Sequence, residues 1–263
     1  MNIRDALSLG DKGVISLVGA GGKSSLMYSL AGELASAGKK VLTTTTTKIF
    51  MPTRKESPVT FVSRVPGEIV AKAETLLRDY SHITVGSEYL QTHDKLNGLE
   101  PSVVEHVLQS NLFDFIIIEA DGAAGRSLKA CAPHEPVVPL FSNYIVALVG
   151  LDVMAKPLIE EWVFRSSIFS RITGLGLKQN VTESSIALSM LHDMSSITTT
   201  GKESQKIAFL NKADDSKAVK AGKRIAALLD KNGNSIFHRI IIGELRPKPL
   251  IHQCRVVQQR RTR

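Results

Sequence analysis

The sequence predicts a three-layer α/β fold in which helices cover both faces of a doubly wound, mostly parallel sheet. Short apolar runs of strand length alternate with segments of helical periodicity along the 263 residues, which is the pattern of such a fold. A helical crossover joins the first two strands, so these strands are expected to be parallel. No linker interrupts residues 1–246, so we expect one domain there, followed by a basic C-terminal tail over residues 247–263.

The individual elements follow from the spacing of apolar residues. The first apolar run, 14–18, ends at a glycine cluster, and Leu26, Leu30 and Leu34 then recur at helical spacing up to Gly38, a residue typical of a helix end. Further strands are expected at 41–47, 83–85, 115–118, 144–149, 206–210 and 238–242, and further helices at 66–79, 102–110, 157–164, 167–173, 182–193 and 215–231. Residues 86–98 and 122–139 are expected to form loops, the second because glycines and prolines interrupt it.

The composition is that of an ordinary globular protein, with 43% hydrophobic and 22% charged residues. The apolar run near the N-terminus is too short for a membrane span or a signal-peptide core, so a cytoplasmic protein without membrane contact is expected. Cys131 and Cys254 lie far apart and are expected to be free thiols. The formal net charge is +8, but only 5% of residues are aromatic. We therefore expect the basic tail to be solvated, with nucleic-acid binding as the weaker alternative.

The most informative segment is the turn between the first strand and the first helix. Residues 19–25 read Gly-Ala-Gly-Gly-Lys-Ser-Ser. Glycines let backbone N–H groups converge, and the helix that follows directs the positive end of its dipole at the same space. The segment departs from the standard P-loop, because Leu17 stands where G-x-x-x-x-G-K-[ST] has its first glycine. The alternative is an ordinary glycine-rich turn.

The phosphate interpretation assigns a role to each residue of this turn. Gly19, Gly21 and Gly22 would form the cradle, and Lys23 would place its charge near the β- and γ-phosphates. Ser24 or Ser25 would supply a hydroxyl group for Mg²⁺.

Two carboxylates follow the buried strand expected at residues 115–118. Glu119 and Asp121 are two residues apart, so an extended backbone would direct both side chains to one side. P-loop enzymes hold Mg²⁺ with a carboxylate at the end of such a strand. The alternative is that a carboxylate caps the next turn.

Residues 211–214 read Asn-Lys-Ala-Asp and follow the strand expected at 206–210. In GTP-binding proteins N-K-x-D recognises guanine: the aspartate accepts hydrogen bonds from the base, the asparagine braces the loop and the lysine stem lies along the ring. The pattern therefore predicts that Asn211, Lys212 and Asp214 select GTP, with ATP as the alternative.

Two more segments belong to the same predicted sheet edge. Thr45, Thr46 or Thr47 could sense the γ-phosphate or orient a water, although a threonine run is also normal strand composition. Four polar residues in the loop after Asp121 are candidates for binding an anion or a substrate: Arg126, Lys129, His134 and Glu135.

Together these segments resemble the YqeC-like family. The resemblance rests on residues 19–25, 41–48, 119–122, 129 with 134–139, and 211–214, and it runs from about residue 10 to about residue 245. It implies a P-loop NTPase-like accessory protein for selenium-dependent molybdenum hydroxylases, whose partners would be such a hydroxylase or its cofactor-maturation proteins. This chain departs from the pattern where a His-Arg pair is expected, because it has Phe164-Arg165.

The leading functional hypothesis is Mg²⁺-dependent binding and hydrolysis of GTP or ATP in support of this maturation. Lys23, Glu119 and Asp121 would carry the chemistry, and Ser24 would hold Mg²⁺ with the two carboxylates. Two alternatives remain open: a carrier that binds an anionic cofactor without hydrolysis, and an enzyme that transfers the phosphoryl group to a small molecule.

Overall fold

The central sheet is built from strands spread over the whole chain. The structure, a computed structural model, describes residues 1–199, 204–230 and 236–257. The strands of the sheet are β1 (Gly13–Gly19), β2 (Val41–Thr45), β4 (Val59–Val62), β5 (His82–Gly86), β8 (Phe115–Glu119), β10 (Tyr144–Gly150), β12 (Gln205–Asn211), β13 (Arg239–Glu244) and β14 (Leu250–Val256). The helices are α1 (Ile3–Leu7), α2 (Lys23–Ser36), α3 (Pro66–Leu76), α4 (Pro101–Gln109), α5 (Ser166–Thr173), α6 (Glu183–Ser195) and α7 (Ser216–Leu229).

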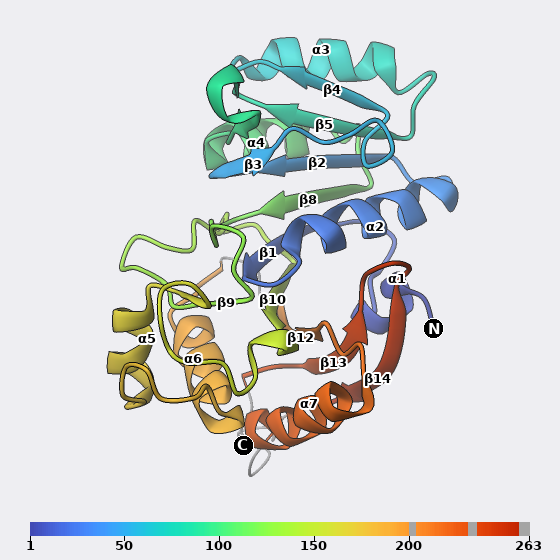
Figure 1. Ribbon diagram of the computed structural model, residues 1–263. Coiled ribbons are helices and arrows are strands. Elements are labelled where there is room, and N and C mark those ends of the chain that lie inside the picture. Colours follow the sequence, from blue (N-terminus) through green and yellow to red (C-terminus); the bar gives the residue numbers. More distant parts are fainter. Residues whose placement is uncertain (200–203, 231–235, 258–263) are drawn as a thin grey trace, which may run out of the picture.

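Among the described residues, nine strands pair in the order β14-β13-β12-β10-β1-β8-β2-β5-β4, which Figure 1 shows from bottom to top. All neighbouring strands are parallel except β13 and β14. The strand order reverses about β1, because β2, β5 and β8 lie on one side of it and β10, β12 and β13 on the other. The doubly wound, mostly parallel sheet that the sequence predicts is therefore confirmed.

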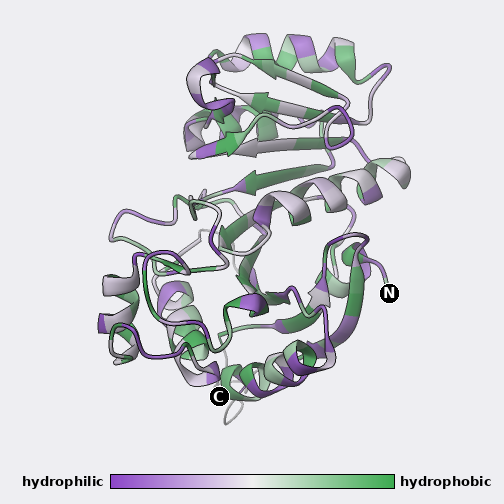
Figure 2. Ribbon diagram, in the orientation of Figure 1, coloured by the Kyte–Doolittle hydropathy of each residue, from purple (hydrophilic) through white to green (hydrophobic). Residues whose placement is uncertain are grey.

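Each face of the sheet has its own hydrophobic core, because successive residues of a strand point to opposite sides. In β1, Val14 and Val18 pack in one core with residues of α3, α4, α6 and α7. Ile15 and Leu17 pack in the other core with residues of α1 and α2. In Figure 2 the central strands are largely hydrophobic, whereas hydrophilic residues mark the outer helices. These two cores make the fold a three-layer α/β structure, as predicted.

The topology brings the sequence motifs to one edge. Strands β1, β8, β10 and β12 are parallel neighbours, so their carboxyl ends lie at the same edge of the sheet. Ligands of doubly wound sheets bind at this edge, outside the point where strand order reverses. The glycine-rich turn between β1 and α2 lies there, near the middle of the molecule in Figure 1.

Three local predictions were wrong. Residues 86–98 are not an irregular loop, because β6 (Glu88–Leu90) and β7 (Lys95–Asn97) pair with β3 (Lys48–Phe50) in a small antiparallel sheet. Residues 157–164 are not a helix: they form turns and end in β11 (Val163–Phe164), which pairs with β9 (Leu128–Lys129). The C-terminal segment is not a tail from residue 247, because β14 extends the main sheet. The first two errors concern strands of two or three residues, whereas β14 has seven residues and pairs with its sequence neighbour β13.

Two other findings bear on the expected environment. In the described ranges, none of the helices has the length and apolar character required to cross a bilayer. Cys131 and Cys254 are both free thiols, as predicted.

Candidate functional site

The turn after β1 requires glycine for conformational reasons. Gly19, Gly21 and Gly22 have positive φ angles of 87°, 80° and 131°, a backbone region that favours glycine. A Cβ atom at Gly21 would lie 2.3 Å from the backbone nitrogen of Gly150. A Cβ atom at Gly22 would lie 2.3 Å from the Nδ2 atom of Asn211. The glycine turn therefore packs closely against the ends of β10 and β12.

Lys23 opens α2 and directs its ammonium back into the turn. Its Nζ atom donates a hydrogen bond to the carbonyl oxygen of Gly19 at 2.6 Å. The same atom lies 3.1 Å from Asp121 Oδ1 and 3.6 Å from Glu119 Oε1. Burial lowers the pKa of Lys23, but the two carboxylates outweigh burial and raise it, so the ammonium stays charged. The predicted lysine and both predicted acids are thus in direct contact.

Ser24, in the first turn of α2, contacts Glu119. Ser24 Oγ donates a hydrogen bond to Glu119 Oε2 at 2.7 Å. Burial raises the pKa of Glu119, and the contacts with Lys23 and Ser24 oppose that rise. Ser25, the other predicted hydroxyl, follows Ser24 in the first turn of α2 and is half-buried. The structure thus selects Ser24 as the hydroxyl beside a carboxylate.

Asp121 is fully buried and holds the site together. Its Oδ2 atom accepts hydrogen bonds from the backbone N–H of Gly19 at 2.8 Å and from Lys129 Nζ at 3.0 Å. Its Oδ1 atom accepts no hydrogen bond from the described residues and contacts Lys23 through the ion pair alone. A buried carboxylate oxygen of this kind is suited to a cation or to a water bound to one.

The residues at the end of β8 fit a Mg²⁺ ion. Ser24, Glu119 and Asp121 offer a hydroxyl and two carboxylates, which are the oxygen ligands that Mg²⁺ prefers. The described residues contain no group of three or more His, Cys, Asp or Glu side chains that could hold a metal. A Mg²⁺ ion held by Ser24 and the two carboxylates would take its remaining ligands from water and a phosphate, as in phosphoryl-transfer sites.

The Asn211–Asp214 segment is joined to the glycine turn by its first residue. Asn211 Nδ2 donates a hydrogen bond to the carbonyl oxygen of Gly21 at 2.6 Å. Lys212 Nζ donates to Ser127 Oγ and to Asp152 Oδ2, both at 2.7 Å. Asp214 follows the end of β12 and is exposed. Asn211 thus braces the glycine turn, and Asp214 lies at the same sheet edge with its carboxylate accessible.

The threonine run serves mainly to hold strands together. Thr43 contacts His82 and Thr84, and Thr45 Oγ1 donates to the carbonyl oxygen of Glu119 at 2.7 Å. The half-buried Thr46 donates to the carbonyl oxygen of Val137 at 2.9 Å. These contacts account for the threonines without a ligand, and the γ-phosphate role remains a prediction.

The four candidates of the 122–139 loop differ in how they relate to the site. Lys129 contacts Asp121 directly, whereas Glu135 lies one contact further out, with 2.6 Å between Lys129 Nζ and Glu135 Oε2. Arg126 contributes backbone to it, because its carbonyl oxygen accepts from the N–H of Gly21 at 3.1 Å. His134 is exposed. Arg165, which no sequence motif marks as a site residue, forms a bidentate pair with Glu135 at 2.5 and 2.9 Å through its guanidinium.

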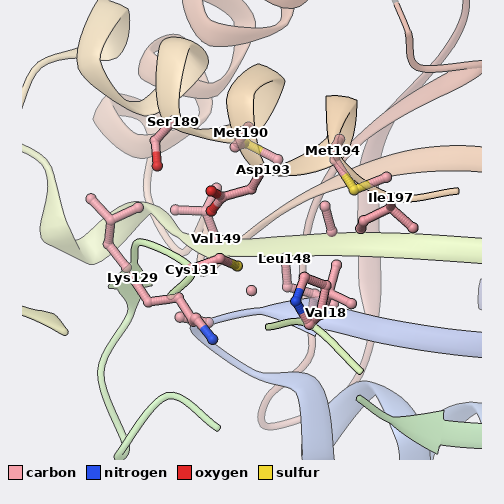
Figure 3. A pocket seen from close by; sticks show the side chains of 15 residues that line it. Val18, Lys129, Cys131, Leu148, Val149, Ser189, Met190, Asp193, Met194 and Ile197 are labelled. Atoms are coloured by element: carbon pink, nitrogen blue, oxygen red, sulfur yellow. The ribbon is translucent and has the colours of Figure 1, made fainter. Parts of the chain in front are cut away.

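A small cavity of about 30 Å³ lies behind the glycine turn, between β1, β10 and α6. Figure 3 shows Cys131, Asp193, Met190 and Met194 around it, with Lys129 extending past it. Burial raises the pKa of both Cys131 and Asp193, which favours their neutral forms. A space of this size holds about one water molecule, so a substrate does not fit there.

Comparison with known proteins identifies the family. A family model described as "YqeC protein" matches residues 15–167. The chain belongs to the YqeC family. A YqeC relative from Escherichia coli (strain K12), described as "Uncharacterized protein YqeC", is 30% identical over 238 residues, covering 90% of this chain and 90% of its own. The resemblance predicted from the sequence motifs is therefore confirmed for the family.

The solved structures include a crystal structure of FtsY from Mycoplasma mycoides. It is 14% identical and has a TM-score of 0.40, and the match covers 94% of this chain and 67% of the FtsY chain. The likeness is too distant to carry an argument about what the YqeC chain binds.

Proposed function

We propose that this YqeC family member binds a nucleoside triphosphate with Mg²⁺ and hydrolyses it. The observation that carries the proposal is the buried contact of Lys23 with Asp121 and Glu119 directly beneath a glycine turn. Buried charges are costly unless they are paired, and clusters of them at a strand edge mark functional sites. Backbone N–H groups, an ammonium and two acids are the set that a Mg²⁺-bound polyphosphate requires.

Each residue has a defined task in the proposed reaction. Lys23 would leave the carboxylates for the β- and γ-phosphates and neutralise their charge. Ser24, Glu119 and Asp121 would hold Mg²⁺, which supplies further neutralisation when bound. Water would attack the γ-phosphorus, and the bond to the β–γ bridging oxygen would break. The electron pair would leave with the nucleoside diphosphate, and the proton of the water would end on inorganic phosphate.

We further propose that the base is guanine, because the exposed carboxylate of Asp214 can accept the hydrogen bonds that guanine offers and adenine does not. On the family resemblance, we propose that hydrolysis supports cofactor insertion into a selenium-dependent molybdenum hydroxylase in the cytoplasm. A strain that lacks this protein should then accumulate the hydroxylase without its complete cofactor.

The test is titration of the purified protein with GTP and ATP in the presence of Mg²⁺, together with release of inorganic phosphate. Lys23→Met should abolish phosphate release. Lys12→Met is the matched control, because Lys12 is an exposed lysine at the start of β1, on the opposite edge of the sheet. Asp214→Ala should weaken GTP binding by roughly 10- to 100-fold and leave ATP binding unchanged. Asp11→Ala, which removes an exposed carboxylate, should change neither affinity.

Other outcomes distinguish the alternatives. Phosphate that appears on an added acceptor rather than in solution would indicate a phosphotransferase. Binding without any release, equal in wild type and Lys23→Met, would indicate a carrier. If neither GTP nor ATP binds in the presence of Mg²⁺, the proposal is wrong.

A further inference from the structure

A row of alternating charges runs from the glycine turn to the molecular surface. It comprises Lys23, Asp121, Lys129, Glu135 and Arg165, and neighbours along it are separated by 3.1, 3.0, 2.6 and 2.5 Å. Side-chain exposure rises along the row, from 0% at Asp121 and 1% at Lys129 to 11% at Glu135 and 21% at Arg165. The row therefore connects the buried phosphate site with a partly exposed residue.

Lys129 is the central member, and its contacts account for all three donor positions of its ammonium. Besides Asp121 and Glu135, Nζ donates a hydrogen bond to the carbonyl oxygen of Gly122 at 2.9 Å. Lys129 also belongs to β9, whose pairing with β11 positions it next to Phe164 in the register. Lys129 therefore contacts both Asp121, in the proposed phosphate site, and Glu135, which binds Arg165.

The outer end of the row lies at the start of α5. Arg165 has a positive φ of 61° and immediately precedes the helix. Glu160 accepts hydrogen bonds from the backbone N–H groups of Arg165 and Ser166. Burial raises the pKa of Glu135, but the hydrogen bonds from Arg165 and Lys129 outweigh burial and bring that pKa to about 2. Glu135 is therefore ionised and fixes Arg165 at this helix end.

We propose that Lys129 is a positioning residue through which occupancy of the phosphate site controls the start of α5. The inference rests on the proposed function. A polyphosphate bound with Mg²⁺ draws Lys23 away from Asp121 and brings the divalent cation to the same carboxylate. Across Asp121, Lys129 then faces a larger positive charge than before, so its ammonium shifts toward Glu135, and the Glu135–Arg165 pair moves with it. In a low-dielectric interior such charge changes act strongly on the next pair in the row.

The chain carries its own reporter of this movement. Trp162 is the single tryptophan of the sequence, it is half-buried three residues before Arg165, and Lys156 lies 4.4 Å from its ring centroid. The experiment follows Trp162 fluorescence while Mg²⁺ with GTP or ATP is added to the full-length protein. Binding is measured in parallel by equilibrium dialysis. In the wild type we expect a fluorescence change whose midpoint matches the dialysis curve.

Variants of residues in this row distinguish an effect on the start of α5 from an effect on nucleotide binding. Glu135→Gln and Arg165→Met lie outside the phosphate contacts, so they should bind nucleotide nearly as well as the wild type and lose most of the fluorescence change. Lys129→Met should lose it as well. Arg224→Met is the matched control, because it breaks the exposed pair with Glu183 instead, and it should keep the full change.

Several outcomes would overturn the inference. Variants that bind nucleotide and keep the full fluorescence change would contradict it, and so would a wild type that binds without any change. A wild type that binds no nucleotide would contradict the proposed function and this inference together. A second test measures amide hydrogen exchange of α5 in the wild type, with and without nucleotide, so it does not depend on any variant being folded. Exchange that does not change on nucleotide binding would contradict the inference.

Discussion

At the scale of single residues, the buried lysines and the buried histidine differ in whether they contact a carboxylate. Lys23 and Lys129 are nearly inaccessible, but each contacts two carboxylates. His82 is also buried, but its ring shares a hydrogen bond with Thr43 and lies near the ring of Tyr28. Burial lowers the pKa of His82 to about 4, so the ring is neutral in the folded protein. The two lysines therefore belong to the candidate site, whereas His82 is part of the packed interior.

The neutral state of His82 makes folding stability depend on pH. An unfolded histidine has a pKa of about 6.5, and the folded value is about 4. Between these values the unfolded chain binds more protons than the folded protein. The contribution of His82 is therefore complete above pH of about 6.5 and falls by about 3 kcal/mol as the pH drops to about 4. Urea denaturation at several pH values measures this loss.

The variant His82→Gln can keep a hydrogen bond with Thr43 and does not titrate, so its stability should depend less on pH across this window. The control is His93→Gln, which changes an exposed histidine. A His82→Gln curve as steep as that of the wild type would rule out this source of pH dependence.

At the scale of elements, the β1–turn–α2 unit combines a turn that requires glycine with a well-packed helix. The three glycines of the turn adopt positive φ angles against neighbouring backbone. The helix that follows buries Leu26, Leu30 and Leu34 completely. Burying three leucines stabilises the unit by roughly 5 kcal/mol, which can offset the loss of about 1–2 kcal/mol of backbone entropy for each ordered glycine of the turn. Packing of α2 therefore holds the turn in its conformation.

Two glycine substitutions in this unit should have opposite effects. Gly21→Ala introduces a Cβ atom 2.3 Å from the backbone of Gly150, at a φ of 80°. It should lower the free energy of unfolding by about 2 kcal/mol or more and weaken polyphosphate binding. Gly32→Ala lies on the exposed side of α2, with nothing within 4 Å of the new Cβ atom. It should raise stability by about 0.5–1 kcal/mol. Urea denaturation of both variants gives the comparison, and equal stabilities would contradict the strain argument.

At the scale of the whole molecule, the sequence predicts what depends on period and local composition. Buried parallel strands such as 115–118 are continuous apolar runs, so their positions and the sheet edge of Glu119 and Asp121 could be predicted. The β9–β11 pair could not, because two residues on each side leave no periodic signal. Arg165 was missed for the same reason: it reaches Glu135 only because that pairing folds the chain back. Pairings between distant short segments are decided by tertiary packing.

The C-terminal segment shows a second limit, weak alternation in an edge strand that pairs with its sequence neighbour β13. The segment is rich in basic and polar residues, yet it forms a strand that pairs with the edge of β13. Ile251 and Cys254 of this strand pack against the core on the α2 face of the sheet. Cys254 Sγ contacts the carbonyl oxygen of Ala6 at 3.4 Å, which joins the C-terminal strand to α1. Half-exposed edge strands alternate weakly in hydrophobicity, and β14 also carries Arg255, which pairs with Asp230.

Truncation tests whether β14 belongs to the domain. A chain that ends at residue 257 keeps the strand, whereas one that ends at residue 248 loses it together with the buried Val257. The shorter chain should be less stable by roughly 3 kcal/mol or more, because several partly buried apolar side chains are lost. It should also self-associate, since the apolar strand β13 becomes an unprotected edge. Thermal denaturation and light scattering of the two chains measure both effects. If the two chains are equally stable and monomeric, β14 is dispensable and the domain ends near residue 246, where the sequence placed its boundary.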